Sequence, residues 1–133
     1  MMVRANEERL LAEIGPEGGA AERLQALMDR VSPLAEVEAA ARTDDALLRG
    51  CATRVWIVGR VADGSLRLAA SATSPLVAGL VRALCELYDG VPVDEARSVE
   101  PTLLRSLGLE HRLTPTRART LAVVRDRIRA LAS

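Results

Sequence analysis

The amino-acid sequence predicts an α+β fold, in which N-terminal and C-terminal helices pack against a small antiparallel sheet built on a hairpin at residues 55–70. Three observations lead to this prediction. Charged and apolar residues alternate at helical spacing before the hairpin and again after it. Between these regions, two β-branched segments flank the turn-forming pair Asp63-Gly64. Because 133 residues are enough to bury a core, we expect one domain over residues 1–133.

Two helices are expected at the N-terminus, over residues 6–14 and 19–31, where apolar residues recur at helical spacing. The glycines and the proline at positions 15–19 break the pattern and predict a loop between the helices. Ser32 and the proline after it combine an N-cap with a first-turn proline. They predict a third, short helix that runs to about Ala41.

The hairpin prediction rests on Asp63-Gly64, a pair preferred in two-residue type I′ turns. Residues 55–61 and 66–70 on either side are rich in aliphatic and β-branched side chains. The turn fixes the register, and we expect Ala62 to face Ser65, Val61 to face Leu66, Arg60 to face Arg67, Gly59 to face Leu68 and Ile57 to face Ala70. One side of the ribbon is then apolar, and the two arginines meet on the other side.

Ser74 followed by proline predicts the start of another helix, which ends before Asp89. Its apolar stripe consists of Leu76, Val77, Leu80, Val81, Leu84, Leu87 and Tyr88. Cys85 lies beside this stripe, and we expect its thiol to be buried and inert. Farther along, the acidic pair Asp94-Glu95 suits the N-terminus of a further helix.

A short helix over residues 101–107 precedes the last helix, which begins after Thr114 with a proline in its first turn. Its buried face is marked by Leu121, Val124, Ile128 and Leu131. Arg117 lies four positions before Leu121 on the same stripe, so it is expected to need an acceptor for its charge. The remaining arginines of this helix are expected to face water: Arg119, Arg125, Arg127 and Arg129.

The composition excludes several chemistries. All 18 basic residues are arginine, so the chain has no lysine for a Schiff base or a P-loop. One histidine, His111, and two separated cysteines cannot supply the ligands of a structural zinc site. A formal net charge of +0 at pH 7 disfavours a nucleic-acid partner. Thiol chemistry, carboxylate chemistry or plain binding remain, and no cofactor or metal is expected on the chain.

The sequence also predicts the cellular compartment. Residues 1–8 lack the apolar segment of a secretion signal. No run of about eighteen apolar residues occurs, and two cysteines do not make a disulfide framework. We therefore expect a cytoplasmic protein without membrane contact.

Cys51 is the candidate reactive residue. It follows a loop expected over residues 42–50, comes directly after Gly50 and leads into the first strand of the hairpin. At this position, outside the paired region, the thiol is expected to be displayed on a loop and not packed. Arg49 and Arg54 flank it, and neighbouring positive charge favours the nucleophilic thiolate. The pattern therefore indicates thiol chemistry.

Three segments with the right order and spacing resemble the SufE family of sulfur acceptors in iron–sulfur cluster assembly. They are Gly50-Cys51-x-Thr53-x-Val55-Trp56-Ile57, the helix from Gly79-Leu80 to Leu87-Tyr88-Asp89-Gly90 with Pro92, and Leu113-Thr114-Pro115-Thr116-Arg117. The resemblance spans roughly residues 42–131 and implies an α+β fold with the acceptor cysteine on a loop. It further implies a persulfide carrier that accepts sulfur from a cysteine desulfurase and stimulates it, rather than an independent enzyme. Such a carrier passes sulfur to an iron–sulfur cluster scaffold, and pyridoxal phosphate belongs to the desulfurase alone.

The resemblance assigns the persulfide acceptor to Cys51 and matches the arginine of the family to Arg117, as a residue that supports the thiolate or loop or contacts the partner. Arg42 falls on a position that is commonly basic. Other positions depart from the family pattern. Where the family often has asparagine, serine, an acidic residue, histidine and glycine, this chain has Ala46, Thr53, Thr73, Arg112 and Thr120.

Two other functions remain open from the residues themselves. A thiol–disulfide redox protein would use Cys51 and Cys85, although their separation offers no resolving-cysteine motif. A helical interaction module would carry no chemistry, and Arg117 would be a structural ion-pair partner. The acceptor function predicts instead that a partner docks around the Cys51 loop and the start of the last helix, including Arg112 and Arg117.

Overall fold

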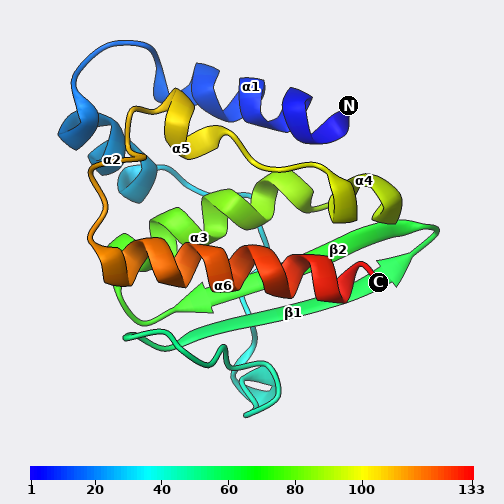
Figure 1. Cartoon of the computed structure of the whole chain (residues 1–133). Coiled ribbons are helices and arrows are strands. Elements are labelled where there is room, and N and C mark those ends of the chain that lie inside the picture. Colours follow the sequence, from blue (N-terminus) through cyan, green and yellow to red (C-terminus); the bar gives the residue numbers. More distant parts are fainter.

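The computed structural model describes residues 1–133. The elements are α1 (Met2–Ile14), α2 (Ala20–Asp29), the 3-10 turn η1 (Ala39–Ala41), β1 (Val55–Ala62), β2 (Ser65–Ala72), α3 (Pro75–Tyr88), α4 (Val93–Ser98), α5 (Leu103–Ser106) and α6 (Pro115–Leu131). Strands β1 and β2 form an antiparallel ribbon, and the α-helices lie on one face of it (Figure 1). The predicted α+β fold, with terminal helices packed on a hairpin, is confirmed. None of the helices has both the length and the apolar character that crossing a membrane requires.

The hairpin forms in the predicted register. Asp63 and Gly64 have φ angles of 52° and 77°, and positive φ at both central residues is what a type I′ turn requires. Arg60 lies opposite Arg67, and this register continues over the whole of both strands. The turn residues therefore determine the pairing, as the sequence indicated.

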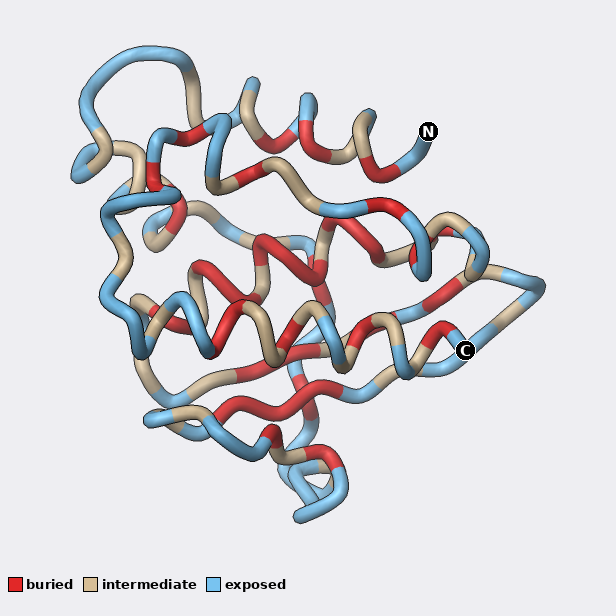
Figure 2. The backbone as a smooth tube through the Cα atoms, viewed as in Figure 1, coloured by how far each residue is buried: buried red, intermediate tan, exposed pale blue.

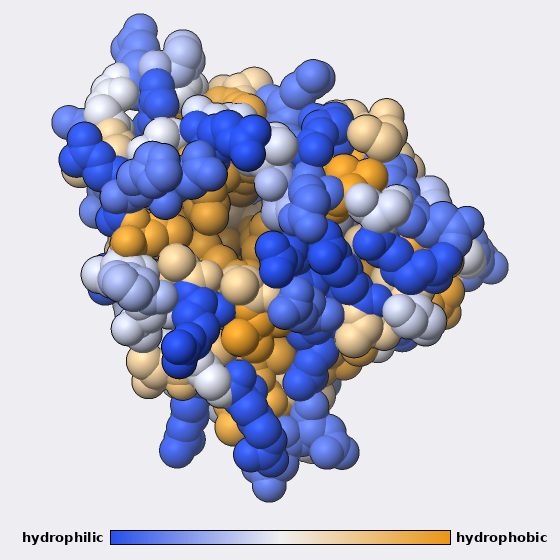
Figure 3. Space-filling view, viewed as in Figure 1, coloured by the Kyte–Doolittle hydropathy of each residue, from blue (hydrophilic) through white to orange (hydrophobic).

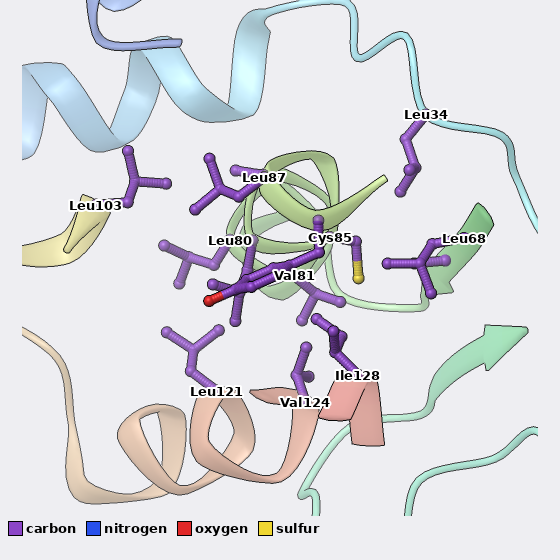
Figure 4. Close-up of a cluster of buried hydrophobic side chains, with 14 of the residues drawn as sticks. Leu34, Leu68, Leu80, Val81, Cys85, Leu87, Leu103, Leu121, Val124 and Ile128 are labelled. Carbon is purple, nitrogen blue, oxygen red and sulfur yellow. The ribbon is translucent and has the colours of Figure 1, made fainter. Parts of the chain in front are cut away.

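The main hydrophobic core lies between the ribbon and the helices. Figure 2 shows buried residues along α3 and on the sides of α6 and the ribbon that face it. In Figure 4, Val124 and Ile128 of α6 point toward α3, and Leu68 of β2 closes the cluster. Full burial of such a side chain stabilises the fold by roughly 1.5–3 kcal/mol relative to exposure. These contacts fix β1, and with it the loop that precedes it.

A second, smaller cluster lies on the opposite face of the ribbon, the face on which Arg60 meets Arg67. Successive strand residues point to opposite faces, so Trp56 points away from the main core and packs with Val37 and Ala46. The Arg42 guanidinium lies 5.0 Å from the Trp56 ring centroid, and its Nε donates a hydrogen bond to the Val37 carbonyl at 3.0 Å. Arg42 thus holds the segment that covers this face.

The helix predicted from Ser32 to about Ala41 is wrong except for η1. The Ser32 hydroxyl donates to the Glu86 carboxylate at 2.9 Å, and the chain then runs extended along the outer edge of β2. There the Ala70 N–H donates to the Ala35 carbonyl at 3.2 Å. A serine followed by proline suits an extended start as well as a helical one. Pairing with the edge of β2 selects the extended conformation.

The last helix begins as predicted, because the Thr114 side chain accepts the N–H of Arg117 at 3.2 Å. The expectation that its other arginines face water holds only for Arg119. Arg125 and Arg129 are half-buried and pair with Glu100. A third, Arg127, is also half-buried and donates to the Asp45 carbonyl at 3.1 Å. These arginines fasten α6 to neighbouring segments.

Candidate functional site

Cys51 lies in a loop of residues 49–54 that is closed by backbone hydrogen bonds. The Leu48 N–H donates to the Val55 carbonyl at 2.9 Å, and the Ile57 N–H donates to the Ala46 carbonyl at 3.0 Å. The segment before the loop therefore pairs antiparallel with the start of β1. This geometry agrees with the predicted placement of Cys51 at the entrance of a strand, in a loop supported by the sheet.

A second support comes from the residues just before α3. The Thr73 N–H donates to the Arg54 carbonyl at 3.1 Å, and the hydroxyls of Thr53 and Thr73 are hydrogen bonded at 2.8 Å. Gly50 has a φ of 88°, a conformation that L side chains rarely adopt. The loop is thus fastened to the start of β1 on one side and to the start of α3 on the other.

The Cys51 side chain is half-buried and packs against the main core. The expectation that it would be displayed without packing was therefore wrong, because hydrogen bonds hold the loop to the start of β1 and to the residues before α3, and its thiol packs against the main core. The thiol forms no hydrogen bond within the protein, and both cysteines are free. Cys51 is thus partly sheltered from water and still reachable from outside.

Cys85 lies in a very different environment, as predicted. Its side chain is 0% exposed, and its sulfur lies on α3 among Val81, Leu68 and Ile128 (Figure 4). Burial raises the pKa of the Cys85 thiol to about 12, so the nucleophilic thiolate is not formed near neutral pH. Cys51 is therefore the one thiol that can react without opening the core.

Arg117 does not find the acceptor that its place on the apolar stripe predicted. It is half-buried in the first turn of α6, and its guanidinium forms no hydrogen bond or ion pair. Partial exposure removes the need for a protein acceptor, since water can solvate the charge. Arg117 therefore has donors available for a group from outside the chain.

Other arginines without a carboxylate partner gather at the same end of the molecule. Strand β1 and helix α6 both begin toward this end (Figure 1). The loop before β1 supplies Arg49 and Arg54, and the segment that starts α6 supplies Arg112, Arg117 and Arg119. None of these five lies within 4.0 Å of a carboxylate. These five arginines therefore have no ion-pair partner within the chain, although the carboxylates of Asp44 and Asp45 line a hollow together with Arg49.

The surface has two main hollows. An apolar cavity of about 230 Å³ opens between α3, α5 and α6, with Leu80, Leu103 and Leu121 in its wall, and Figure 3 shows the apolar hollow. A second hollow lies between α6 and residues 44–49. Neither is lined by Cys51. No group of three histidine, cysteine or acidic side chains is placed to hold a metal ion. Cys51 thus lies on an accessible loop and outside both of these hollows.

Sequence reasoning missed the hydrogen bonds that position the loop. The Thr53 and Thr73 hydroxyls are 20 positions apart in the chain, and no local pattern links them. The only signal was that both positions depart from the family pattern, and the structure places these two departures in contact. The pairing of residues 46–48 with β1 was also hidden, because that segment is too short to read as a strand.

Comparison with known proteins identifies the family of this domain. The SufE family model, described as an Fe-S metabolism associated domain, matches residues 8–132. The chloroplastic quinolinate synthase of Oryza sativa subsp. japonica is 34% identical over 101 residues, which cover 75% of this chain and 14% of that protein. An uncharacterized SufE-like protein of Synechocystis sp. is 31% identical over 71 residues, 53% of this chain and 45% of that protein. The chain thus spans less than half the length of either relative.

A solved structure shows a similar fold. The solution structure of a hypothetical protein from Thermus thermophilus matches with a TM-score of 0.66 over 98% of this chain and 93% of that one. The two sequences are 23% identical, so this likeness concerns the fold alone. The arrangement of helices around the hairpin is therefore shared with a structure determined by experiment.

Proposed function

Because the chain belongs to the SufE family, whose domain is associated with iron–sulfur metabolism, we propose that it is a persulfide carrier. In this proposal Cys51 accepts sulfane sulfur from a partner cysteine desulfurase. The carrier stimulates that enzyme and passes the sulfur to an iron–sulfur cluster scaffold. The observation that carries the proposal is the position of Cys51, a reachable and half-sheltered thiol on a loop anchored at both ends.

The transfer is an exchange of one sulfur–sulfur bond for another. The Cys51 thiolate attacks the outer sulfur of a cysteine persulfide on the partner, and the bond between the two partner sulfurs breaks. The electron pair of that bond leaves on the partner thiolate, which takes up a proton, while the Cys51 thiol has lost one. Cys51 then carries the sulfane sulfur, and the step consumes no oxidant or reductant.

The surroundings of Cys51 suit delivery of sulfur by a protein. Cys51 lines neither of the two main hollows, which suits a donor that brings its sulfur on a protruding group or receives the loop into its own site. Half-burial against the core would also limit contact of the persulfide with water and oxidants. The chain has no lysine that could bind pyridoxal phosphate as a Schiff base, so we assign this cofactor to the partner.

The partner surface is proposed to include the arginines at the thiol end, meaning the end of the molecule that holds the Cys51 loop and the start of α6. Arg117 is half-buried and unpaired, Arg112 is exposed, and both precede or begin the helix that starts near the loop. Their unpaired charges would attract an acidic surface and raise the rate of encounter. We therefore expect Arg112→Glu to weaken stimulation of the desulfurase, whereas Arg9→Glu on α1 should leave it unchanged. Equal stimulation by both variants would remove this surface from the proposal.

The direct test is intact mass spectrometry after incubation with a cysteine desulfurase and free cysteine. The expected result is a gain of one sulfur atom that a reductant reverses, in the unmodified chain and in Cys85→Ala. The gain should be absent from Cys51→Ser. A chain whose Cys51 alkylates normally but gains no sulfur would contradict the proposal. Loss of transfer in Cys85→Ala with the fold intact would point instead to thiol–disulfide redox chemistry.

A further inference from the structure

The two outer edges of the ribbon are covered to different extents. Along β2, successive backbone N–H groups that point away from β1 form hydrogen bonds within the protein. The Leu66 N–H donates to the Val91 carbonyl at 2.8 Å, and the Leu68 N–H donates to the Asp89 carboxylate at 2.9 Å. The next outward donor, the N–H of Ala70, donates to the Ala35 carbonyl in the segment that precedes η1. The β2 edge therefore has no stretch of free backbone in its middle.

The outer edge of β1 is covered only over its first residues. Residues 46–48 pair with Val55 and Ile57, whose backbone groups point away from β2. Because this direction alternates along an antiparallel strand, the N–H and C=O groups of Gly59 and Val61 point the same way. Neither residue takes part in a backbone hydrogen bond outside the helices and strands. Free donors and acceptors thus begin where the covering segment ends.

Side chains along this free edge are partly apolar and partly basic. Val58 is 38% exposed and Val61 is 51% exposed, and the two side chains point to opposite faces of the ribbon. Arg60 lies between them and faces Arg67 across the ribbon. Neither arginine has a carboxylate within 4.0 Å. The edge therefore offers backbone hydrogen bonds, apolar contacts and unpaired positive charge together.

We propose that residues 58–62 bind an extended acidic segment of a partner protein, which adds to the ribbon as a third strand beside β1. Backbone groups of the partner would pair with Gly59 and Val61, as in other cases of strand addition. A carboxylate opposite Arg60 would supply the charge that the ribbon lacks.

A second copy of the chain fits this edge poorly. Antiparallel self-pairing that joins Gly59 to Val61 of the other copy would place Arg60 directly opposite its own equivalent. Like charges in facing positions destabilise a sheet, and each arginine already faces Arg67 on its own ribbon. In this register the charge pattern opposes self-association and favours an acidic strand.

This inference goes beyond sulfur transfer, because the free edge lies between residues 46–48 and the turn at Asp63-Gly64 and does not include the loop of Cys51. A partner strand at residues 58–62 would leave that loop uncovered. The Cys51→Ser chain should therefore bind the acidic segment as the unmodified chain does. Failure of sulfur acceptance and failure of strand addition are in this way separate results.

The experiment is a titration of the ¹⁵N-labelled chain, followed by amide resonances, with two blocked peptides. One is acetyl-Thr-Val-Thr-Glu-Thr-Val-Thr-amide, and the matched peptide has lysine in place of glutamate. The glutamate peptide should shift the amides of Gly59 and Val61 and slow their exchange with solvent. It should bind about threefold more tightly than the lysine peptide, as expected for replacing a repulsive facing pair by an attractive one. Equal binding of both peptides, or shifts centred elsewhere, would overturn the proposal.

Two variants and one matched control make the test specific. Val61→Pro removes an outward N–H and is compatible with an edge strand, so the chain should fold and lose the peptide. Val31→Pro is the matched control, because Val31 is 93% exposed and follows Arg30, whose ψ of 147° suits a residue before proline. Arg60→Glu, which does not alter the backbone, should reverse the preference toward the lysine peptide. Unchanged preference in Arg60→Glu, or concentration-dependent self-pairing at Gly59 and Val61 of the unmodified chain, would refute the acidic occupant.

Discussion

Removing the Thr73 hydroxyl should make Cys51 more reactive without unfolding the protein. Thr73→Val keeps the shape of the side chain and the backbone N–H that donates to the Arg54 carbonyl, but it deletes the 2.8 Å bond with Thr53. That bond is one of the fastenings of the loop of residues 49–54. Its loss shifts the loop toward open conformations, in which the half-buried thiol is more accessible.

The size of the effect follows from the position of the bond. A hydrogen bond contributes about 0.5–1.5 kcal/mol net, and Thr73 is exposed, so the lower part of this range applies. A shift of about 0.5–1 kcal/mol changes the open fraction about two- to fivefold. The rate of Cys51 alkylation by iodoacetamide, followed by intact mass, should rise by the same factor. The free energy of unfolding in urea should fall by no more than about 1 kcal/mol.

Two further variants decide whether the loop is the cause. Thr116→Val removes an exposed hydroxyl that makes no hydrogen bond, so its alkylation rate should match that of the unmodified chain. Thr53→Val removes the other half of the same bond, and adding it to Thr73→Val should have little further effect. Alkylation of Thr73→Val at the unmodified rate, with unfolding also unchanged, would show that the hydroxyl pair does not restrain the loop.

Three other predictions concern the framework around the loop. Glu7→Gln should lower the free energy of unfolding in urea by about 2–3 kcal/mol. The Glu7 side chain is 3% exposed and its carboxylate accepts the Thr102 N–H at 2.6 Å, and the substitution replaces this charged acceptor with a neutral amide. A decrease under about 1 kcal/mol would contradict this. Gly59→Ala should cost about 1–3 kcal/mol in the same assay, since a Cβ there would lie 2.8 Å from Leu131 Cδ1 and 3.1 Å from Leu68 Cδ2. A Leu131→Ala background should remove the first of these two contacts and lower the cost. Burial raises the pKa of Cys85 to about 12, so the contribution of Cys85 to stability should be full below the unfolded value of about 8.5 and decline as pH rises toward 12. Urea midpoints across this range should decline less in Cys85→Ala, and parallel pH profiles would refute the linkage.

The hairpin and the long helices were predictable because their signals are local. Asp63-Gly64 specifies a type I′ turn, and the turn sets the register of both strands. Ser74 and Thr114 each accept a backbone N–H three residues later, which is the bond that an N-cap forms in any helix. In each case the residues that determine the structure lie within a few positions of it.

The segment from Ser32 to Ala41 was not predictable in this way. Its first residues suit a helix, but the outward groups of β2 need partners, and Ala35 supplies one. Val37 and Ala46 also cover Trp56, which would otherwise expose its ring on the outer face of the ribbon. The extended path is therefore determined by the needs of a strand that lies more than 30 positions later in the chain.

The candidate site depends partly on local sequence signals and partly on contacts between distant segments. Cys51 could be singled out from the glycine before it and the strand that follows. Its half-burial depends on the hydrogen bonds that Leu48 and Thr73 form with the residues on either side of the loop, and only the folded chain brings these groups together. For Arg117 the helical pattern predicted a buried charge with a partner inside the protein. The first turn of α6 instead leaves that side chain at the surface of the thiol end, with free donors and no carboxylate nearby. An arginine that lies on an apolar stripe but lacks an internal partner gains an acceptor only when another molecule supplies one. Water can supply this acceptor at a half-buried side chain, and the partner surface proposed above would supply it from a protein.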